Sequence, residues 1–420
     1  MTQRDATDKP QERRLFSSAR QLPVRSALHA CRFTLYAVDY SIDFSVCKEK
    51  STNLKNRGCL TTQYVCVIVV EKEKEELVQL VKNEINAKQR FSIAMSTCSI
   101  LSAILVVWIH AYNVDVYGGA EPPIFWMQEV ISQGIARGGV PFFLMSSAFF
   151  LYSKEKTIKD VYWSRARSVL LPYLLWNVIY MVAFAVLQAV GLTSSGMDQI
   201  SLNNVLQGVL LHKYNYAFWF MRDLIVLLFL YPLIRWILHR GKAVSYVALA
   251  MLLLVFCCGV EWLESSFYYF IGAILGYHYR EWVESIVTLK KKWQIGITVG
   301  LFCVVAVLFW FKNVCKIDSV ELVMIRDLFM AFLMVFFVVT CNVRITGFFA
   351  GLSFMIYCIH PLLLEMIEKT IYLCMPHTEL WMVLDYILAP ALCILIITGV
   401  CALWKKWLPS VYQLLNGGRL

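Results

Sequence analysis

The stretch SIAMSTCSILSAILVVWIHAY, residues 92–112, decides the fold class. It contains no Asp, Glu, Lys or Arg, and it matches the roughly 20 apolar residues that a helix needs to cross a bilayer. A helix also satisfies all of its own backbone hydrogen-bonding groups within lipid. We therefore interpret residues 92–112 as a transmembrane helix that carries a histidine, His110, near its end.

Similar apolar stretches recur along the rest of the chain. Of the 420 residues, 59% are hydrophobic and only 16% are charged, which excludes a soluble globular protein. The sequence therefore predicts an all-α membrane protein, a bundle of about ten transmembrane helices. The expected spans lie near residues 92–112, 136–153, 168–190, 216–236, 243–260, 266–280, 294–311, 321–340, 347–368 and 384–404.

The distribution of basic residues predicts the orientation of this bundle. The formal net charge is +10, and the basic residues cluster between the apolar segments, which argues against nucleic acid as a partner. Loops on one side hold sixteen Lys and Arg residues, and loops on the other side hold five. Because short cytoplasmic loops accumulate Lys and Arg, both termini are expected in the cytoplasm. We predict a multi-pass protein of the cell membrane (inner or plasma membrane), in contact with membrane lipids.

The first 90 residues differ from the rest. Residues 1–60 are charged and aperiodic, with no apolar run long enough for a signal peptide. The segment QYVCVIVV, residues 63–70, has the composition of a short strand, and residues 71–90 have the spacing of an amphipathic helix. We expect a poorly ordered N-terminal extension over residues 1–90 that ends in this helix, followed by a transmembrane domain over residues 91–410.

Two histidines in apolar spans are candidate functional residues, because ionisable side chains in lipid are costly. His110 ends the first span, where a structural interpretation is an interfacial histidine. His360 lies within the ninth span and precedes a proline, which kinks a helix and frees a backbone carbonyl. The alternative for His360 is a histidine packed structurally at that kink.

Two Arg-Asp dipeptides lie early in predicted spans, Arg222–Asp223 in the fourth and Arg326–Asp327 in the eighth. Adjacent helical residues point about 100° apart, so each pair is expected to bridge to other helices rather than to itself. The predicted orientation places both pairs in the same half of the membrane as His110. Together they can line one polar cavity, with structural ion pairing as the alternative.

Arg165 and Arg167 precede the third span at the predicted cytoplasmic face. Positive-inside anchoring explains either residue alone. Beside Lys154, Lys156 and Lys159, however, they also form a cationic rim, and guanidinium groups match phosphate oxygens well. A nucleotide-bearing donor from the cytosol would need such a rim.

Five segments resemble, in the right order, the acyltransferase family 3 integral-membrane O-acyltransferases. The resemblance covers residues 91 to about 404. The segments are VVWIH (106–110), RGGVPFFLMSSAFFLY (137–152), RARSVLLPYLLWN (165–177), AFWFMRDLIVLLFLYPLI (217–234) and LSFMIYCIHPLLL (352–364).

The chain departs from the family pattern at two points. The family carries a basic residue eleven positions before the first-helix histidine, where this chain has Ser99. That residue would lie about 16 Å from His110 along the same helix. The usual Ser-Gly after the Phe-Phe is Ser146–Ser147. If the missing basic residue helps to hold the donor, another group such as Arg165 or Arg167 must compensate.

The resemblance implies transfer of an acyl group, usually acetyl, from cytosolic acyl-CoA onto a hydroxyl of a cell-envelope carbohydrate or lipid-linked carbohydrate. Acyl-CoA would be a co-substrate, with no tightly bound cofactor and no metal site. The implied catalytic base is His110, since the pKa of histidine lies near neutrality, and His360 is the second candidate. The remaining candidates are Arg165 and Arg167 for the CoA phosphates, and Arg137, Arg222 and Asp223 for orienting His110 or the acceptor.

Two other functions place polar residues inside a helical bundle. A secondary transporter or flippase of a polar or lipid-linked substrate would do so, although the sequence shows no convincing internal repeat. An inactive membrane sensor or scaffold is the second alternative, suggested by Ser99. Release of free CoA that depends on an acceptor would distinguish an enzyme from both.

Overall fold

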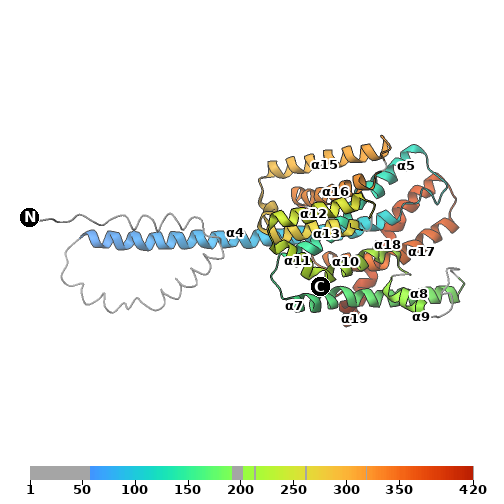
Figure 1. Ribbon diagram of the computed structural model, residues 1–420, viewed down its shortest axis with the longest axis horizontal. Coiled ribbons are helices and arrows are strands. Elements are labelled where there is room, and N and C mark those ends of the chain that lie inside the picture. The colour runs from blue at the N-terminus through green and yellow to red at the C-terminus, as the bar shows by residue number, and fades with distance from the viewer. Residues whose placement is uncertain (1–56, 192–201, 212–213, 261–262, 318, 420) are drawn as a thin grey trace, which may run out of the picture. The chain divides into compact units, whose positions relative to one another are not determined.

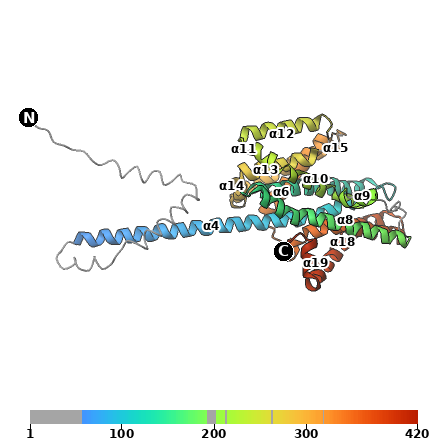
Figure 2. The same ribbon diagram turned by 60° about the horizontal axis from the view of Figure 1, so that its bottom comes forward.

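The computed structural model describes residues 57–191, 202–211, 214–260, 263–317 and 319–419, and the regular elements in these ranges are all helical. Contacts divide the chain into two units, residues 1–80 and 81–420. Most of the expected N-terminal extension, residues 1–56, lies outside the described residues. The second unit holds every candidate site residue and is shown from two directions in Figures 1 and 2.

The first described element, α4 (Arg57–His110), corrects one expectation. Residues 63–70, expected as a short strand, are helical, as are residues 71–90. A strand needs a partner strand to satisfy its backbone, and the described residues contain none. The β-branched residues Val and Ile therefore follow the helix that continues on their C-terminal side, because propagating a helix is easier than starting one.

All ten predicted spans fall on helices. The first is the C-terminal half of α4, and the others are assigned as follows: α6 (Gly139–Tyr152), α8 (Leu171–Ala189), α10 (Trp219–Phe229) with α11 (Tyr231–His239), α12 (Lys242–Cys257), α13 (Glu264–His278), α15 (Lys291–Asn313), α16 (Val320–Cys341), α17 (Ser353–Cys374) and α18 (Glu379–Trp407). The shorter helices are α5 (Pro122–Gln128), α7 (Ile158–Arg165), α9 (Leu202–Leu210), α14 (Arg280–Glu284) and α19 (Pro409–Leu415).

The described residues contain six helical segments that are long and apolar enough to cross a membrane, or seven with one broken span. The broken span is α10 with α11, which bend by 57° at Leu230, just before Pro232. Of the remaining predicted spans, α12 is a shorter apolar helix. The chain is therefore an all-helical multi-pass membrane protein, and the count of ten spans and the side of the termini stay predictions.

The closest helix packing joins α13 to α6. Gly272 and Gly276 are spaced by four residues on α13, and a Cβ atom on either would overlap the main chain of α6, at Met145 and Phe149 respectively. Small residues at this spacing let two helices approach closely in a membrane. This contact fixes α6 in the middle of the unit, directly after the segment that carries Arg137.

One end of the bundle brings together several of the basic segments that the sequence predicts on one side. Arg235 in the middle of α11 donates to the Lys156 carbonyl at 2.5 Å, and Arg280 at the start of α14 donates to the Ser153 carbonyl at 3.0 Å. Figure 1 shows α7 and α11 at this end, and α5 and α9 at the opposite end. We call the first the basic end.

Candidate functional site

His110 and His360 meet in the structure. Their rings stack with centroids 5.3 Å apart and an interplanar angle of 30°. His110, at the end of α4, is half-buried and also packs edge-on against Tyr216 at 5.0 Å. His360, in the middle of α17, is fully buried. Two candidates from distant parts of the sequence therefore share one site.

The proline after His360 determines how that histidine is held. Pro361 has no N–H to donate to Tyr357, four residues earlier, and Nδ1 of His360 takes this place at 2.9 Å from the Tyr357 carbonyl. The Ile356 carbonyl lies 3.0 Å from the same nitrogen. Because carbonyls only accept hydrogen bonds, Nδ1 carries the proton and Nε2 of a neutral ring has a free lone pair.

The Nε2 atom of His360 is buried and has no hydrogen-bond partner among the described residues. A neighbouring tyrosine stabilises the same turn of α17, since the Tyr180 hydroxyl donates to the Cys358 carbonyl at 2.9 Å. The backbone N–H of Leu362 points to that hydroxyl at 3.4 Å. The carbonyl that Pro361 leaves free thus accepts from His360, and a tyrosine hydroxyl bonds to the next carbonyl of the same turn.

A cavity of about 250 Å³ lies against His110. Its polar lining residues are His110, Arg137, Glu264, Ser265, Tyr268 and Asp327, and its apolar wall includes Phe143, Trp219, Phe220 and Tyr357. The volume is sufficient for an acyl group with part of an acceptor but small for a whole sugar-bearing substrate. The site is therefore a cavity with several polar lining residues, one of which is His110.

Two glycines direct Arg137 into this cavity. A Cβ on Gly138 would lie 2.8 Å from Cγ of Met330, and a Cβ on Gly139 would lie 3.1 Å from the Ser102 carbonyl. The Arg-Gly-Gly segment therefore lies directly between α16 and α4. Arg137 reaches from it to α16, where Nε donates to Asp327 Oδ2 at 2.8 Å.

Asp327 also binds its own neighbour in the sequence. Nε and Nη2 of Arg326 donate to Oδ1 of Asp327 at 2.9 and 2.7 Å. The expectation that each dipeptide bridges to other helices rather than to itself is therefore half wrong. The long Arg326 side chain curls back to the adjacent carboxylate because its fully buried charge needs an anion close by.

The second dipeptide repeats this arrangement. Arg222 donates to Asp223 Oδ1 at 2.8 Å, and Ser265 of α13 donates to Asp223 Oδ2 at 2.8 Å. Ser265 itself lines the cavity, whereas neither Arg222 nor Asp223 does. Asp223 is thus connected to the cavity through one intervening serine. Of the four residues in the two dipeptides, which were expected to line one polar cavity, Asp327 alone is among the cavity's lining residues.

Glu264 and Tyr268 are cavity residues that the sequence analysis missed. Glu264 opens α13 and accepts a hydrogen bond from the Tyr268 hydroxyl at 2.9 Å. Tyr268 lies in the predicted span over residues 266–280, and Glu264 lies just before that span. The signal that was available is their spacing of four residues, which places them on one helix face.

A buried polar cluster fixes the end of α4 that carries His110. The side chain of Asn113 donates to Asp385 of α18 at 3.0 Å, and its backbone N–H donates to Gln128 of α5 at 3.1 Å. Ser132 donates to the Trp108 carbonyl at 2.6 Å, two residues before His110. His110 is therefore held by contacts to three different segments.

Arg165 and Arg167 lie apart from this cavity, near the basic end, where a one-turn π-helix (Ala166–Leu170) joins α7 to α8. Arg167 is exposed and stacks over the Trp163 ring at 4.4 Å, whereas Arg165 is half-buried. Ser99, at the position of the family's basic residue, only donates to the Met95 carbonyl at 2.9 Å. It offers no charge to a ligand.

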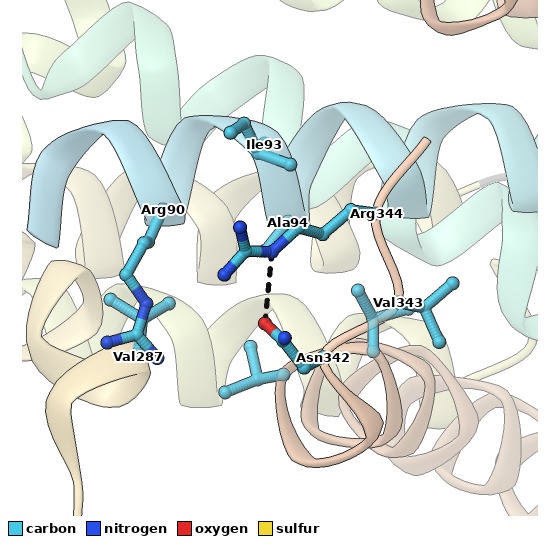
Figure 3. Close-up of a pocket in the computed structure, with 9 residues that line it drawn as sticks. Arg90, Ile93, Ala94, Val287, Asn342, Val343 and Arg344 are labelled. Atoms are coloured by element: carbon cyan, nitrogen blue, oxygen red, sulfur yellow. Dashed lines mark hydrogen bonds between the residues drawn. The ribbon is translucent and has the colours of Figure 1, made fainter. Parts of the chain in front are cut away.

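A second cavity lies between α4 and the end of α16, near Arg90 and Arg344 (Figure 3). Arg344 donates to Asn342 at 3.1 Å, and Asn342 has a left-handed backbone with φ of 52°. The cavity measures about 20 Å³, the space of a single water molecule. It is too small for a substrate.

Two comparisons with known proteins give matches to this chain. The chain is 27% identical over 157 residues to the succinoglycan biosynthesis protein ExoH of Rhizobium meliloti (strain 1021), which covers 34% of this chain and 42% of that protein. The match thus spans less than half of the relative, and no solved structure matches the chain. The acyltransferase 3 family, described as an acyltransferase domain, matches residues 100–405. The chain belongs to this acyltransferase family, whose match includes both histidines, the cavity and the Arg165 segment.

Proposed function

We propose that the chain is a membrane O-acyltransferase that moves an acyl group, acetyl in the first instance, from acyl-CoA to a hydroxyl of a cell-envelope carbohydrate or glycolipid. The observation that carries this proposal is the stacked pair His110 and His360 beside a cavity that also contains Arg137. The family match supports acyl transfer. The name of the relative, a succinoglycan biosynthesis protein, supports a polysaccharide acceptor.

His110 is the better candidate for the catalytic base because it lines the cavity, whereas His360 is fully buried. In the reaction, a ring nitrogen of His110 takes the proton of the acceptor hydroxyl as its oxygen attacks the thioester carbonyl. The carbon–sulfur bond then breaks, and the leaving thiolate receives the proton from His110. His360, fixed by its backbone hydrogen bonds, positions the His110 ring and is the second candidate base.

Arg137 is the candidate for stabilising the oxyanion of the tetrahedral intermediate. It lines the same cavity as His110, and its side chain is about one third exposed even though Nε is bound to Asp327. Its remaining N–H groups can therefore face a negatively charged oxygen. Arg222 and Asp223 act from further away, by orienting α13 through Ser265.

The donor enters at the basic end in this proposal. Arg165 and Arg167 bind the CoA phosphates there, and the pantetheine arm extends between the helices toward the histidine pair. Ser99 of α4 is neutral and takes no part in binding the phosphates. In this proposal the Arg165 segment therefore binds the CoA phosphates without the first-helix basic residue that the family carries.

The test is release of free CoA by the purified protein in detergent, supplied with acetyl-CoA and a panel of glycan acceptors. We expect the wild type to release CoA, His110→Ala to lose at least about 100-fold in rate through loss of the base, and Arg165→Ala to raise KM for acetyl-CoA. Lys316→Ala, in the loop between α15 and α16, is the matched control. Full activity of folded His110→Ala would remove His110 from its role.

A further inference from the structure

The C-terminal segment after α18 packs against the beginning of α8. The Trp176 indole of α8 donates to the Leu415 carbonyl at 3.1 Å, and Figure 1 shows the C-terminus beside the α7–α8 junction. Asn416 is fully buried and donates to the Arg419 carbonyl at 2.6 Å. The last described residues are therefore held in a defined turn against the helix that follows Arg165.

Gly417 brings Arg419 close to the Arg165 segment. A Cβ on Gly417 would lie 2.5 Å from the Ser168 carbonyl and 2.6 Å from Nη1 of Arg419. The guanidinium of Arg419 and the backbone of Ser168 thus flank the same point, and Ser168 follows Arg165 by one helical turn. Gly417 also has φ of +66°, a conformation that favours glycine.

Arg419 and the Arg165 segment bring two positive charges to this part of the structure. No salt bridge joins Arg165 or Arg419 to a carboxylate among the described residues, and Arg419 donates only to the Asn416 carbonyl, at 2.9 Å. Burial lowers the pKa of Arg419 to about 10, and the like charge of Arg165 contributes to this shift. Both groups remain charged at neutral pH, in a place that disfavours two positive charges.

The position of Arg419 relates this pair to the histidines. Its guanidinium lies over the Phe354 ring at 4.2 Å, in the first turn of α17. His360 follows Phe354 by six residues on the same helix, about 9 Å at the helical rise per residue. The pantetheine arm of CoA is longer than this distance, so one molecule can reach from the two arginines to the histidine pair.

We propose that Arg419 and Arg165 together form a phosphate-binding site for the acyl-CoA donor, with the C-terminal segment Pro409–Arg419 as one of its walls. This inference rests on the proposed function and adds a residue that lies beyond the family match, which ends at residue 405. A phosphate between the two guanidinium groups would supply the missing anion through paired hydrogen bonds. Arg419 would then take the place of the basic residue that the family carries at the position of Ser99.

The experiment measures binding of CoA, and separately of pantetheine, to the full-length protein in nanodiscs of zwitterionic lipid. We expect Arg419→Gln to weaken CoA binding about tenfold or more, as for loss of a charge-assisted hydrogen bond, and to leave pantetheine binding unchanged. Arg419→Lys should recover part of the affinity. Arg344→Gln, an exposed arginine of the small cavity in Figure 3, is the control and should bind CoA as the wild type does.

Turnover separates a binding role from a structural one. Arg419→Gln should raise KM for acetyl-CoA with little change in kcat, and Gly417→Ala, which displaces the segment without removing a charge, should do the same. Equal CoA affinity of wild type and Arg419→Gln, with normal turnover in both, would overturn this inference alone. A wild type that neither binds CoA nor releases it from acetyl-CoA would overturn the proposed function as well. Arg419-dependent binding of anionic lipid, without CoA binding, would assign the site to a lipid phosphate and contradict the donor role.

Discussion

At the scale of single residues, the arrangement around His360 depends on what Pro361 cannot do. Without an N–H at residue 361, the Tyr357 carbonyl is available to Nδ1 of His360, which fixes both the ring and its tautomer. Sequence inspection could anticipate the freed carbonyl, because it follows from proline chemistry alone. Whether His360 bonds to this carbonyl depends on the rotamer of its side chain, which the sequence does not specify.

Pro361→Ala tests this arrangement. The alanine N–H would bond to the Tyr357 carbonyl and compete with His360, so the ring would keep only the Ile356 carbonyl as a partner and would be held less firmly. We expect kcat to fall by up to about 100-fold, as for a misplaced catalytic group, with KM for acetyl-CoA unchanged. Pro390→Ala, which removes the proline inside α18, is the control and should retain activity. Equal kcat in Pro361→Ala and wild type would contradict a positioning role for this proline.

The two Arg-Asp dipeptides allow a matched test of buried charge. Asp327→Ala leaves Arg326 uncompensated in a fully buried position and removes the partner of Arg137. We expect a loss of about 3–5 kcal/mol in stability, the usual cost of breaking a buried ion pair. Asp223→Ala should cost clearly less, since its partner Arg222 is 46% exposed. Thermal unfolding in detergent measures both, and equal losses would mean that burial does not govern these pairs.

At the scale of elements, the sequence predicted the positions of the helices well and their partners poorly. All ten expected spans are helical, because long apolar runs leave a membrane segment few other conformations. The pairing of α13 with α6 could not be predicted, although Gly272 and Gly276 show the spacing of a close helix contact. Gly296 and Gly300 of α15 have the same spacing and no atom within 4 Å of an added Cβ. Spacing alone therefore does not identify the contact.

This difference between two glycine pairs gives a prediction for helix packing. Gly276→Ala would force α13 away from the Phe149 main chain, and overpacking of this kind typically costs about 1–3 kcal/mol. Gly300→Ala should leave stability unchanged or raise it slightly, because alanine favours a helix. Unfolding temperatures of the two variants, measured in one detergent, make the comparison. A loss in Gly300→Ala as large as that in Gly276→Ala would indicate that the face of α15 that carries Gly300 also packs against a partner.

At the scale of the whole molecule, the site residues separate into two groups, as the sequence suggested. The histidines, Arg137 and Asp327 gather around the cavity, whereas Arg165 lies near the basic end with the C-terminal segment. The proposed role of Arg419 in phosphate binding could not be predicted from the sequence, because a basic residue beyond the last apolar run is typical of positive-inside charge. Only the fold brings it to the segment that follows Arg165, a residue 254 positions earlier in the chain.

This separation predicts a reaction with a defined direction across the membrane. If donor and acceptor approach from opposite ends, acetyl-CoA should support turnover in sealed proteoliposomes only for molecules whose basic end faces the added substrate. A protease site inserted at Gly241, in the turn between α11 and α12, reports that orientation, because an added side chain there meets no atom within 4 Å. Protease digestion of the outward-facing fraction gives its size, and CoA release should scale with that fraction. Release that follows the oppositely oriented fraction would place the donor at the end with α5. It would remove Arg165 and Arg419 from the donor path, since α7, which ends at Arg165, lies at the other end of the bundle (Figure 1).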